Sequence, residues 1–203
     1  MWALVEDGSI TKLINNPKGL IIEDIQYSRN IFSLWSVAEK EAKGIYEIVW
    51  DNSKKKDEEY YTNTNQTFTY DADAGTVTAT YGDATAKPHA DVLFTAQDEV
   101  DGLGTEGEVN ARGLKYQKIR QIKKQAASEL AGTDWYIVRK ADADTAVPSA
   151  ITNHRAAVRT KCAQMETAVT NAADTPALET LYTYTTTDGV QSRPLGELPT
   201  LES

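Results

Sequence analysis

The apolar pattern of this 203-residue chain changes across one short stretch, Asp101-Gly102-Leu103-Gly104-Thr105-Glu106-Gly107. Three glycines within six residues give the backbone the freedom of a linker, which we place at residues 101–109. Residues 1–100 contain short β-prone runs separated by turn signals, whereas residues 110–173 carry apolar residues at spacings of three and four. The sequence therefore predicts an α+β fold: an N-terminal antiparallel β-rich module with one short helix, a glycine-rich linker and a C-terminal two-helix hairpin.

Local signals define elements within the first hundred residues. Asp7-Gly8 joins two β-prone runs, and this dipeptide favours a tight hairpin turn because both residues tolerate a positive φ. Ser36 and Glu39 have the spacing of a capping box, in which each side chain satisfies an amide at a helix N-terminus. Because Gly44 is well placed to end that helix, we expect a short helix over residues 37–43.

The clearest β signal is a hairpin in which residues 66–70 face residues 76–81 across the loop 71–75. The aspartates and the glycine of this loop resemble a calcium-binding loop. However, Tyr81 stands where the bidentate glutamate of such a loop belongs. A plain hairpin tip is therefore the favoured interpretation.

Two long helices are expected after the linker, over residues 110–131 and 149–172, followed by a tail over residues 174–203 that is extended or partly docked. The apolar stripe of the first helix consists of Ile119, Ile122, Ala126 and Leu130, and that of the second consists of Ile151, Val158, Cys162, Met165 and Val169. Stripes this narrow suit pairing with one partner helix or a coiled coil. Arg155 interrupts the second stripe at a heptad position, where it can fix the register or meet a carboxylate such as Glu129 or one on another chain.

A run of positive charge without any acid lies on the first of these helices. Its members are Arg112, Lys115, Lys118, Arg120, Lys123 and Lys124. The charges lie around the helix, and Tyr116 is the one aromatic residue among them. An ordinary solvated helix, a site for an acidic protein partner and, least favoured, a nucleic-acid site are the three interpretations of this basic patch.

Composition disfavours several function classes. The formal charge of -9 opposes binding to nucleic acid or anionic membranes, and no run approaches the roughly 18 apolar residues of a membrane span. A single cysteine and two distant histidines predict no disulfide, metal site or cofactor. We find no catalytic motif, although the many carboxylates leave open a sugar hydrolase that uses a carboxylate pair. The N-terminus lacks the pattern of a secretion signal, so we expect synthesis in a cytoplasm.

The most specific pattern lies between the two long helices. A helix runs into Thr133-Asp134-Trp135 and then Arg139, and Pro148 and Ile151 begin a helix that carries Arg155 and Arg159. This pattern, over about residues 113–170, resembles the C-terminal domain of bacteriophage tail assembly and tail-fibre assembly chaperone-type proteins. The resemblance implies a helical hairpin that binds other phage proteins. As a structural element alone, Trp135 is expected to be a core ring that fixes the angle between the helices.

These features together predict a non-enzymatic bacteriophage tail-associated protein, a structural or assembly component of the tail or tail fibre. We expect it to bind other tail or fibre proteins and to form a homo-oligomer, for which a trimer is one arrangement. It would be made in the host cytoplasm and either incorporated in the virion tail or used only during assembly. The candidate partner-binding residues are Trp135, Arg139, Arg155, Arg159, Val158, Cys162 and Met165. The alternatives are an envelope-sugar hydrolase of a phage tail and a locally basic nucleic-acid-binding module.

Overall fold

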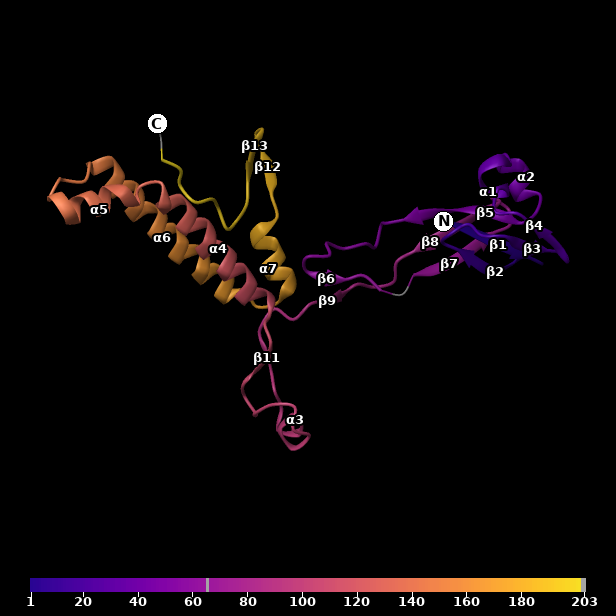
Figure 1. Cartoon of the computed structure of the whole chain (residues 1–203), viewed down its shortest axis with the longest axis horizontal. Helices are drawn as coiled ribbons and strands as arrows, with labels where there is room; N and C mark the ends of the chain where they lie inside the picture. The colour runs from indigo at the N-terminus through magenta and orange to yellow at the C-terminus, as the bar shows by residue number, and fades with distance from the viewer. Residues whose placement is uncertain (65, 202–203) are drawn as a thin grey trace. The chain divides into compact units, whose positions relative to one another are not determined.

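A computed structural model describes residues 1–64 and 66–201, and it divides the chain into two compact units, Met1–Thr85 and Ala86–Ser203. The first unit is rich in strands and the second contains the long helices, so the predicted α+β class is confirmed (Figure 1). The boundary between the units precedes the predicted linker. Residues 101–109 therefore lie inside the second unit and do not join the two.

A five-stranded sheet with the strand order β2-β1-β5-β8-β7 forms the N-terminal unit. Its strands are β1 (Trp2–Glu6), β2 (Ser9–Ile14), β5 (Ile45–Asp51), β7 (Thr67–Asp71) and β8 (Thr76–Thr80). Three of the four pairings are antiparallel, but β5 and β8 run parallel. The prediction of an entirely antiparallel module is thus wrong at this pair, because the chain between β5 and β8 crosses over and adds the β7–β8 hairpin at the sheet edge.

Both predicted hairpins are present. Asp7 and Gly8 adopt φ values of 49° and 74° between β1 and β2, as the tight turn requires. In the β7–β8 hairpin, the Asp71 carboxylate accepts hydrogen bonds from the backbone N–H groups of Asp73 and Ala74. The Asp71 side chain therefore stabilises the hairpin tip.

Apolar clusters cover both faces of the sheet. One cluster consists of Leu4, Ile14, Leu20, Ile22, Ile31, Phe32 and Ile45, and the other consists of Ala3, Val5, Ile48, Val77 and Ala79. Two short helices, α1 (Ile31–Leu34) and α2 (Val37–Glu41), follow the small hairpin of β3 (Leu20–Ile22) and β4 (Ile25–Tyr27). The capping box of Ser36 and Glu39 begins α2 as predicted, whereas α1 is a second short helix that the sequence pattern did not specify.

The N-terminal unit ends in a two-stranded pairing of β6 (Tyr61–Thr62) with β9 (Thr85–Ala86). The second unit then opens with an excursion in which β10 (Val92–Leu93) pairs with β11 (Val109–Ala111) around α3 (Ala96–Val100). Thr95 and Asp98 form a capping box at the start of α3. The glycine-rich stretch closes this excursion, and a Cβ atom on Gly104 would lie 2.5 Å from the ring of Phe94. The glycines here permit close packing within a loop.

Two long antiparallel helices, α4 (Leu114–Ala131) and α6 (Ser149–Asn171), pack side by side as predicted (Figure 1). A further helix, α5 (Asp134–Ala143), lies between them in the sequence, where only a connector was expected. The predicted extended tail is also wrong in part. It contains α7 (Thr175–Tyr182) and a hairpin of β12 (Thr185–Thr187) and β13 (Val190–Ser192), because Leu178 and Leu195 are buried there.

Two searches of the described residues give negative findings. In that part of the chain, no helix is both long enough and apolar enough to span a membrane. Across the same residues, no group of three or more histidine, cysteine, aspartate or glutamate side chains is arranged to hold a metal ion.

Candidate functional site

The apolar stripes of α4 and α6 pack against each other within the chain. Val158 and Met165 of α6 have exposed fractions of 0% and 1%, and Ile122 of α4 is equally buried. These side chains form an internal seam, because each helix provides the single apolar partner that the other requires. Val158 and Met165 were predicted to bind a partner. That prediction is wrong for the folded unit, since neither side chain is accessible to another chain.

Cys162 lies at the edge of the same seam and is partly buried. Its thiol donates a hydrogen bond to Oε1 of Glu166 at 3.3 Å, and Glu166 forms an ion pair of 3.1 Å with Lys123 of α4. Burial raises the pKa of the Cys162 thiol, and the hydrogen bond to Glu166 raises it further. The neutral thiol and the neighbouring ion pair thus both add contacts at the edge of the seam.

Arg155 holds the end of α4 to the start of α5. Its Nη1 lies 2.9 Å from the carbonyl oxygen of Leu130, 2.6 Å from Oγ1 of Thr133 and 2.8 Å from a carboxylate oxygen of Asp134. The side chain is almost fully buried. The expected carboxylate partner, Glu129, is replaced by Asp134. The carbonyl groups at the C-terminus of α4 attract the Arg155 guanidinium, because they carry partial negative charge. The guanidinium then lies within reach of Asp134, the first residue of α5.

The helix that Arg155 anchors exposes apolar side chains. Trp135, Ile137 and Val138 have exposed fractions of 51%, 44% and 65%, and α5 contains no buried residue. We call these three residues, together with Tyr136 and Arg139, the α5 surface. The Trp135 ring stacks on Tyr136 with a centroid distance of 3.9 Å, and the Arg139 guanidinium lies 4.8 Å from the Trp135 centroid. The expectation that Trp135 is a core ring is wrong, because about half of its surface is exposed.

Arg139 and Arg159, the other two arginines of the Thr133–Arg159 pattern, have different surroundings. Arg139 is partly buried, and its Nε has no hydrogen-bond partner among residues 1–64 and 66–201. Arg159 is exposed on α6, four residues beyond Arg155. Of the predicted partner-binding residues, Trp135 and Arg159 are therefore exposed and Arg139 is partly exposed, whereas Arg155 contacts the start of the helix that carries Trp135 and Arg139.

Three of the six residues of the predicted basic patch contact other elements of the second unit. Lys115 donates to the carbonyl oxygen of Thr170 near the end of α6, and Lys123 pairs with Glu166. Lys118 is buried, and its Nζ lies 4.1 Å from the centroid of the Tyr182 ring on α7. These three lysines contact the elements beside α4, although the Lys123 side chain remains 60% exposed.

The other half of the patch shares one side of α4. A shallow hollow of about 570 Å³ lies there, and its lining residues are Arg112, Tyr116, Gln117, Arg120, Gln121 and Lys124. We call these six residues the basic face of α4. The guanidinium of Arg112 lies 4.3 Å from the Tyr116 centroid and also pairs with Asp91 at 2.6 Å. Within the described parts of the chain, Arg120 and Lys124 form no ion pair.

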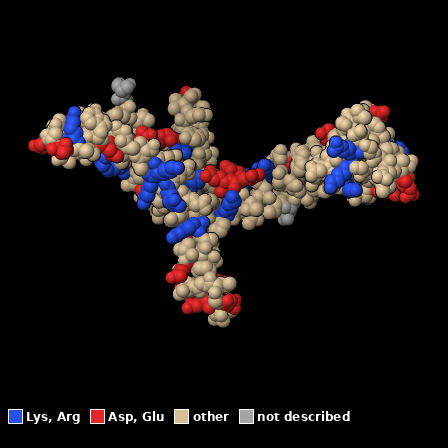
Figure 2. All heavy atoms as spheres, viewed as in Figure 1, with Lys and Arg blue, Asp and Glu red and all other residues tan. Residues whose placement is uncertain are grey.

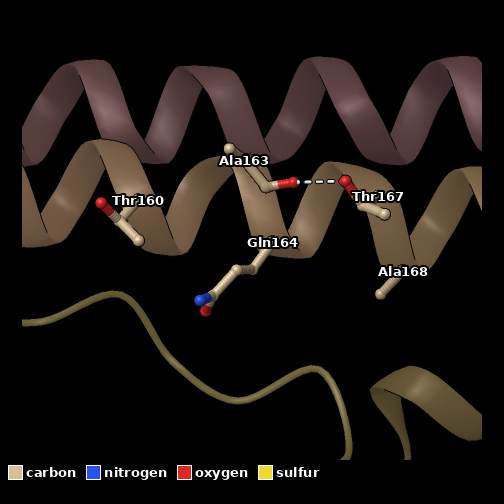
Figure 3. Close-up of a pocket in the computed structure, with 5 residues that line it drawn as sticks. All are labelled: Thr160, Ala163, Gln164, Thr167 and Ala168. Atoms are coloured by element: carbon tan, nitrogen blue, oxygen red, sulfur yellow. Dashed lines mark hydrogen bonds between the residues drawn. The ribbon is translucent and has the colours of Figure 1, made fainter.

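A second hollow, of about 600 Å³, lies along α6 (Figure 3). Its lining residues are Thr160, Ala163, Gln164, Thr167 and Ala168. The Thr167 hydroxyl donates to the Ala163 carbonyl at 2.9 Å, so this hydroxyl is occupied by its own helix. None of the five lining side chains is an acid or a base, and this hollow therefore supplies no proton-transfer group.

Comparison with known proteins adds no relative. No protein-family model, no curated protein and no solved structure matches this chain. The candidate sites thus depend on the residues themselves. Sequence reasoning missed Asp134 as the partner of Arg155 and the exposure of Trp135. Tyr116, the aromatic residue within the basic run, was the available signal for the basic face of α4.

Proposed function

We propose that this chain is a non-enzymatic bacteriophage tail-associated protein, a structural or assembly component that binds another tail or fibre subunit through the α5 surface. The observation that carries the proposal is α5 itself: a helix without buried residues that is nevertheless held by a nearly buried arginine. A helix of this length is marginal in water unless it packs against something. A partner that covers Trp135 and Val138, which lie three residues apart on one side of the helix, would supply that packing.

The composition of the α5 surface supports a protein partner. Tryptophan, tyrosine and arginine are enriched at the centres of protein interfaces, where a few such residues contribute most of the binding free energy. Trp135, Tyr136 and Arg139 are stacked together on α5. Because the stack already exists in the single chain, less conformational entropy is lost on binding. The partner we expect presents an apolar groove with a carboxylate at its rim for Arg139.

The phage assignment rests on the sequence pattern of Thr133, Asp134, Trp135 and the paired arginines, which resembles phage tail assembly proteins. In the structure, three of these residues meet at one junction, where Arg155 contacts Thr133 and Asp134 and thereby positions Trp135. The pattern is thus connected to the exposed surface by direct contacts. Under this proposal the chain is made in the host cytoplasm and acts in, or during the assembly of, the virion tail.

Complementation of a phage that lacks this gene tests the proposal. We expect particles without complete tails or fibres in electron micrographs, and restoration by the wild-type chain. Trp135→Ala combined with Val138→Ser should lower the infectious titre by about a hundredfold, as loss of an interface hot spot of about 3 kcal/mol would predict. Val190→Ser, which changes an equally exposed valine in the same unit, should complement fully. Normal tails without the gene, or full complementation by the α5 variant, would contradict the proposal.

A further inference from the structure

The excursion around α3 carries an exposed acidic tip. Its exposed carboxylates belong to Glu99, Asp101, Glu106 and Glu108, and residues 91–111 contain no lysine or arginine. Between these acids, Val100 and Leu103 have exposed fractions of 80% and 64%. We call these six residues the acidic tip. An exposed apolar pair surrounded by like charges is typical of a surface that binds a basic partner with an apolar centre.

The acidic tip is built as a defined loop. The capping box of Thr95 and Asp98 begins α3, and the backbone N–H of Glu106 donates to a carboxylate oxygen of Glu99 at 3.1 Å. The Phe94 ring packs on Gly104, so any larger residue at position 104 would require that ring to move. The tip can therefore dock with little loss of conformational entropy.

The basic face of α4 has the complementary character. Arg112, Arg120 and Lys124 surround Tyr116 and the aliphatic parts of two glutamines over a shallow hollow. Figure 2 shows Lys and Arg side chains gathered over α4 and acidic side chains gathered at the α3 excursion. Each surface thus combines an apolar centre with a charged rim, and the two rims have opposite sign.

The acidic tip cannot reach the basic face of its own chain. The base of the excursion is fixed to the start of α4, because Asp91 accepts hydrogen bonds from the Gly113 backbone at 2.8 Å and from Arg112. At Gly113 a Cβ atom would lie 2.2 Å from the carbonyl oxygen of Ala90, so the two segments are in close contact. From this base, α3 projects away from α4 (Figure 1). In this arrangement the two surfaces of one chain do not meet, so a contact between them would join two molecules.

From this geometry we infer that the chain associates with a second copy of itself, the acidic tip of one copy docking on the basic face of α4 of the next. The contact is heterologous, because it joins two different surfaces, and each copy retains a free tip and a free face for further copies. It uses none of the residues of the α5 surface. The inference is therefore independent of the proposed tail partner.

Analytical ultracentrifugation of the full chain at low and high salt tests the inference. At about 0.05 M salt we expect concentration-dependent oligomers, and an association at least about tenfold weaker at about 0.5 M salt, where charges are screened over shorter distances. Arg120→Glu with Lys124→Glu, or Asp101→Lys with Glu106→Lys, should each make the chain monomeric. Lys18→Glu with Arg29→Glu, a matched reversal of two exposed charges in the N-terminal unit, should leave association unchanged.

Mixing the two charge-reversed chains is the decisive experiment. The α4 variant keeps the wild-type acidic tip and the tip variant keeps the wild-type basic face, so an equimolar mixture should form a one-to-one complex although neither chain self-associates. A monomeric wild-type chain at low salt would overturn the inference. So would dissociation by the α4 variant but not by the tip variant, or a wild-type chain that stays monomeric yet binds duplex DNA. Trp135→Ala should not alter self-association; an effect there would likewise contradict the assignment.

Discussion

The seam between α4 and α6 and the α5 surface lie at opposite extremes of accessibility, although residues of both were predicted to bind a partner. Val158 and Met165 in the seam are fully buried, whereas Trp135 and Val138 on α5 are more than half exposed. The difference follows from what each helix meets. The α6 stripe has a matching stripe on α4 in the same chain, whereas α5 contains no buried residue.

This comparison shows what heptad spacing indicates in a single chain. Apolar residues three and four apart predict that a helix has a helical partner, but they do not say whether that partner belongs to the same molecule. Here the short connection through α5 brings α4 and α6 together. The surfaces that we propose for other molecules are α5, the basic face of α4 and the acidic tip, none of which belongs to the apolar seam.

The largest effect on the free energy of unfolding is expected from introducing a charge into the seam. Val158→Asp places a carboxylate between α4 and α6 without a partner, which should lower the free energy of unfolding of the second unit by more than about 4 kcal/mol. Val138→Asp makes the same change on exposed α5 and should alter it by less than about 0.5 kcal/mol. Thermal denaturation followed by far-ultraviolet circular dichroism measures both. Equal effects would mean that the two sites do not differ in burial.

A smaller effect is expected at the junction between the two regions. Arg155→Met should lower the free energy of unfolding by about 2 kcal/mol, because the Leu130 carbonyl, the Thr133 hydroxyl and Asp134 lose a charged donor. The amides of α5 should also exchange faster with solvent than those of α6. Arg159→Met, an exposed arginine one turn further along α6, is the matched control. If both variants behave alike, Arg155 does not anchor α5.

The smallest effect concerns the reactivity of Cys162. Because its pKa is raised above the ordinary 9.0, the thiolate is scarcer in the folded chain, and alkylation by iodoacetamide at pH 8 should be slower on the order of tenfold than for an exposed cysteine. The raised pKa favours the protonated folded state. This contribution to stability is therefore complete below pH 9.0 and is lost as the pH rises through the folded-state pKa.

A variant with Cys162→Ala and Ala163→Cys is the control for the alkylation experiment, because it moves the thiol to an exposed position. It should react with iodoacetamide at the ordinary rate; slow alkylation of both chains would contradict the role of burial.

Local signals predicted the elements whose stabilising contacts are local. Asp7-Gly8 forms the expected turn, Ser36 and Glu39 form the expected capping box, and the hairpin of β7 and β8 has the expected loop. Each depends on residues within a few positions of one another. The two long helices were also predicted, because their apolar periodicity extends over several turns.

Predictions failed where the deciding contact lies far away in the sequence. The parallel pairing of β5 with β8 depends on a crossover that neither strand encodes. The glycine-rich stretch belongs to the α3 excursion because Phe94 packs on Gly104 and Asp91 holds the start of α4. Arg155, twenty residues after Trp135 in the chain, bonds Thr133 and Asp134 at the beginning of α5, and Trp135 is exposed beside this junction.

The amino-acid sequence alone determined that this protein has strands followed by long amphipathic helices, and it located the Thr133–Arg159 pattern and the basic run on α4. Only the tertiary structure decided which of these residues remain accessible. Periodicity, turns and caps result from interactions between near neighbours, whereas accessibility depends on which distant surface covers a side chain. A basic or apolar residue becomes available to a partner only when the rest of the fold leaves it uncovered.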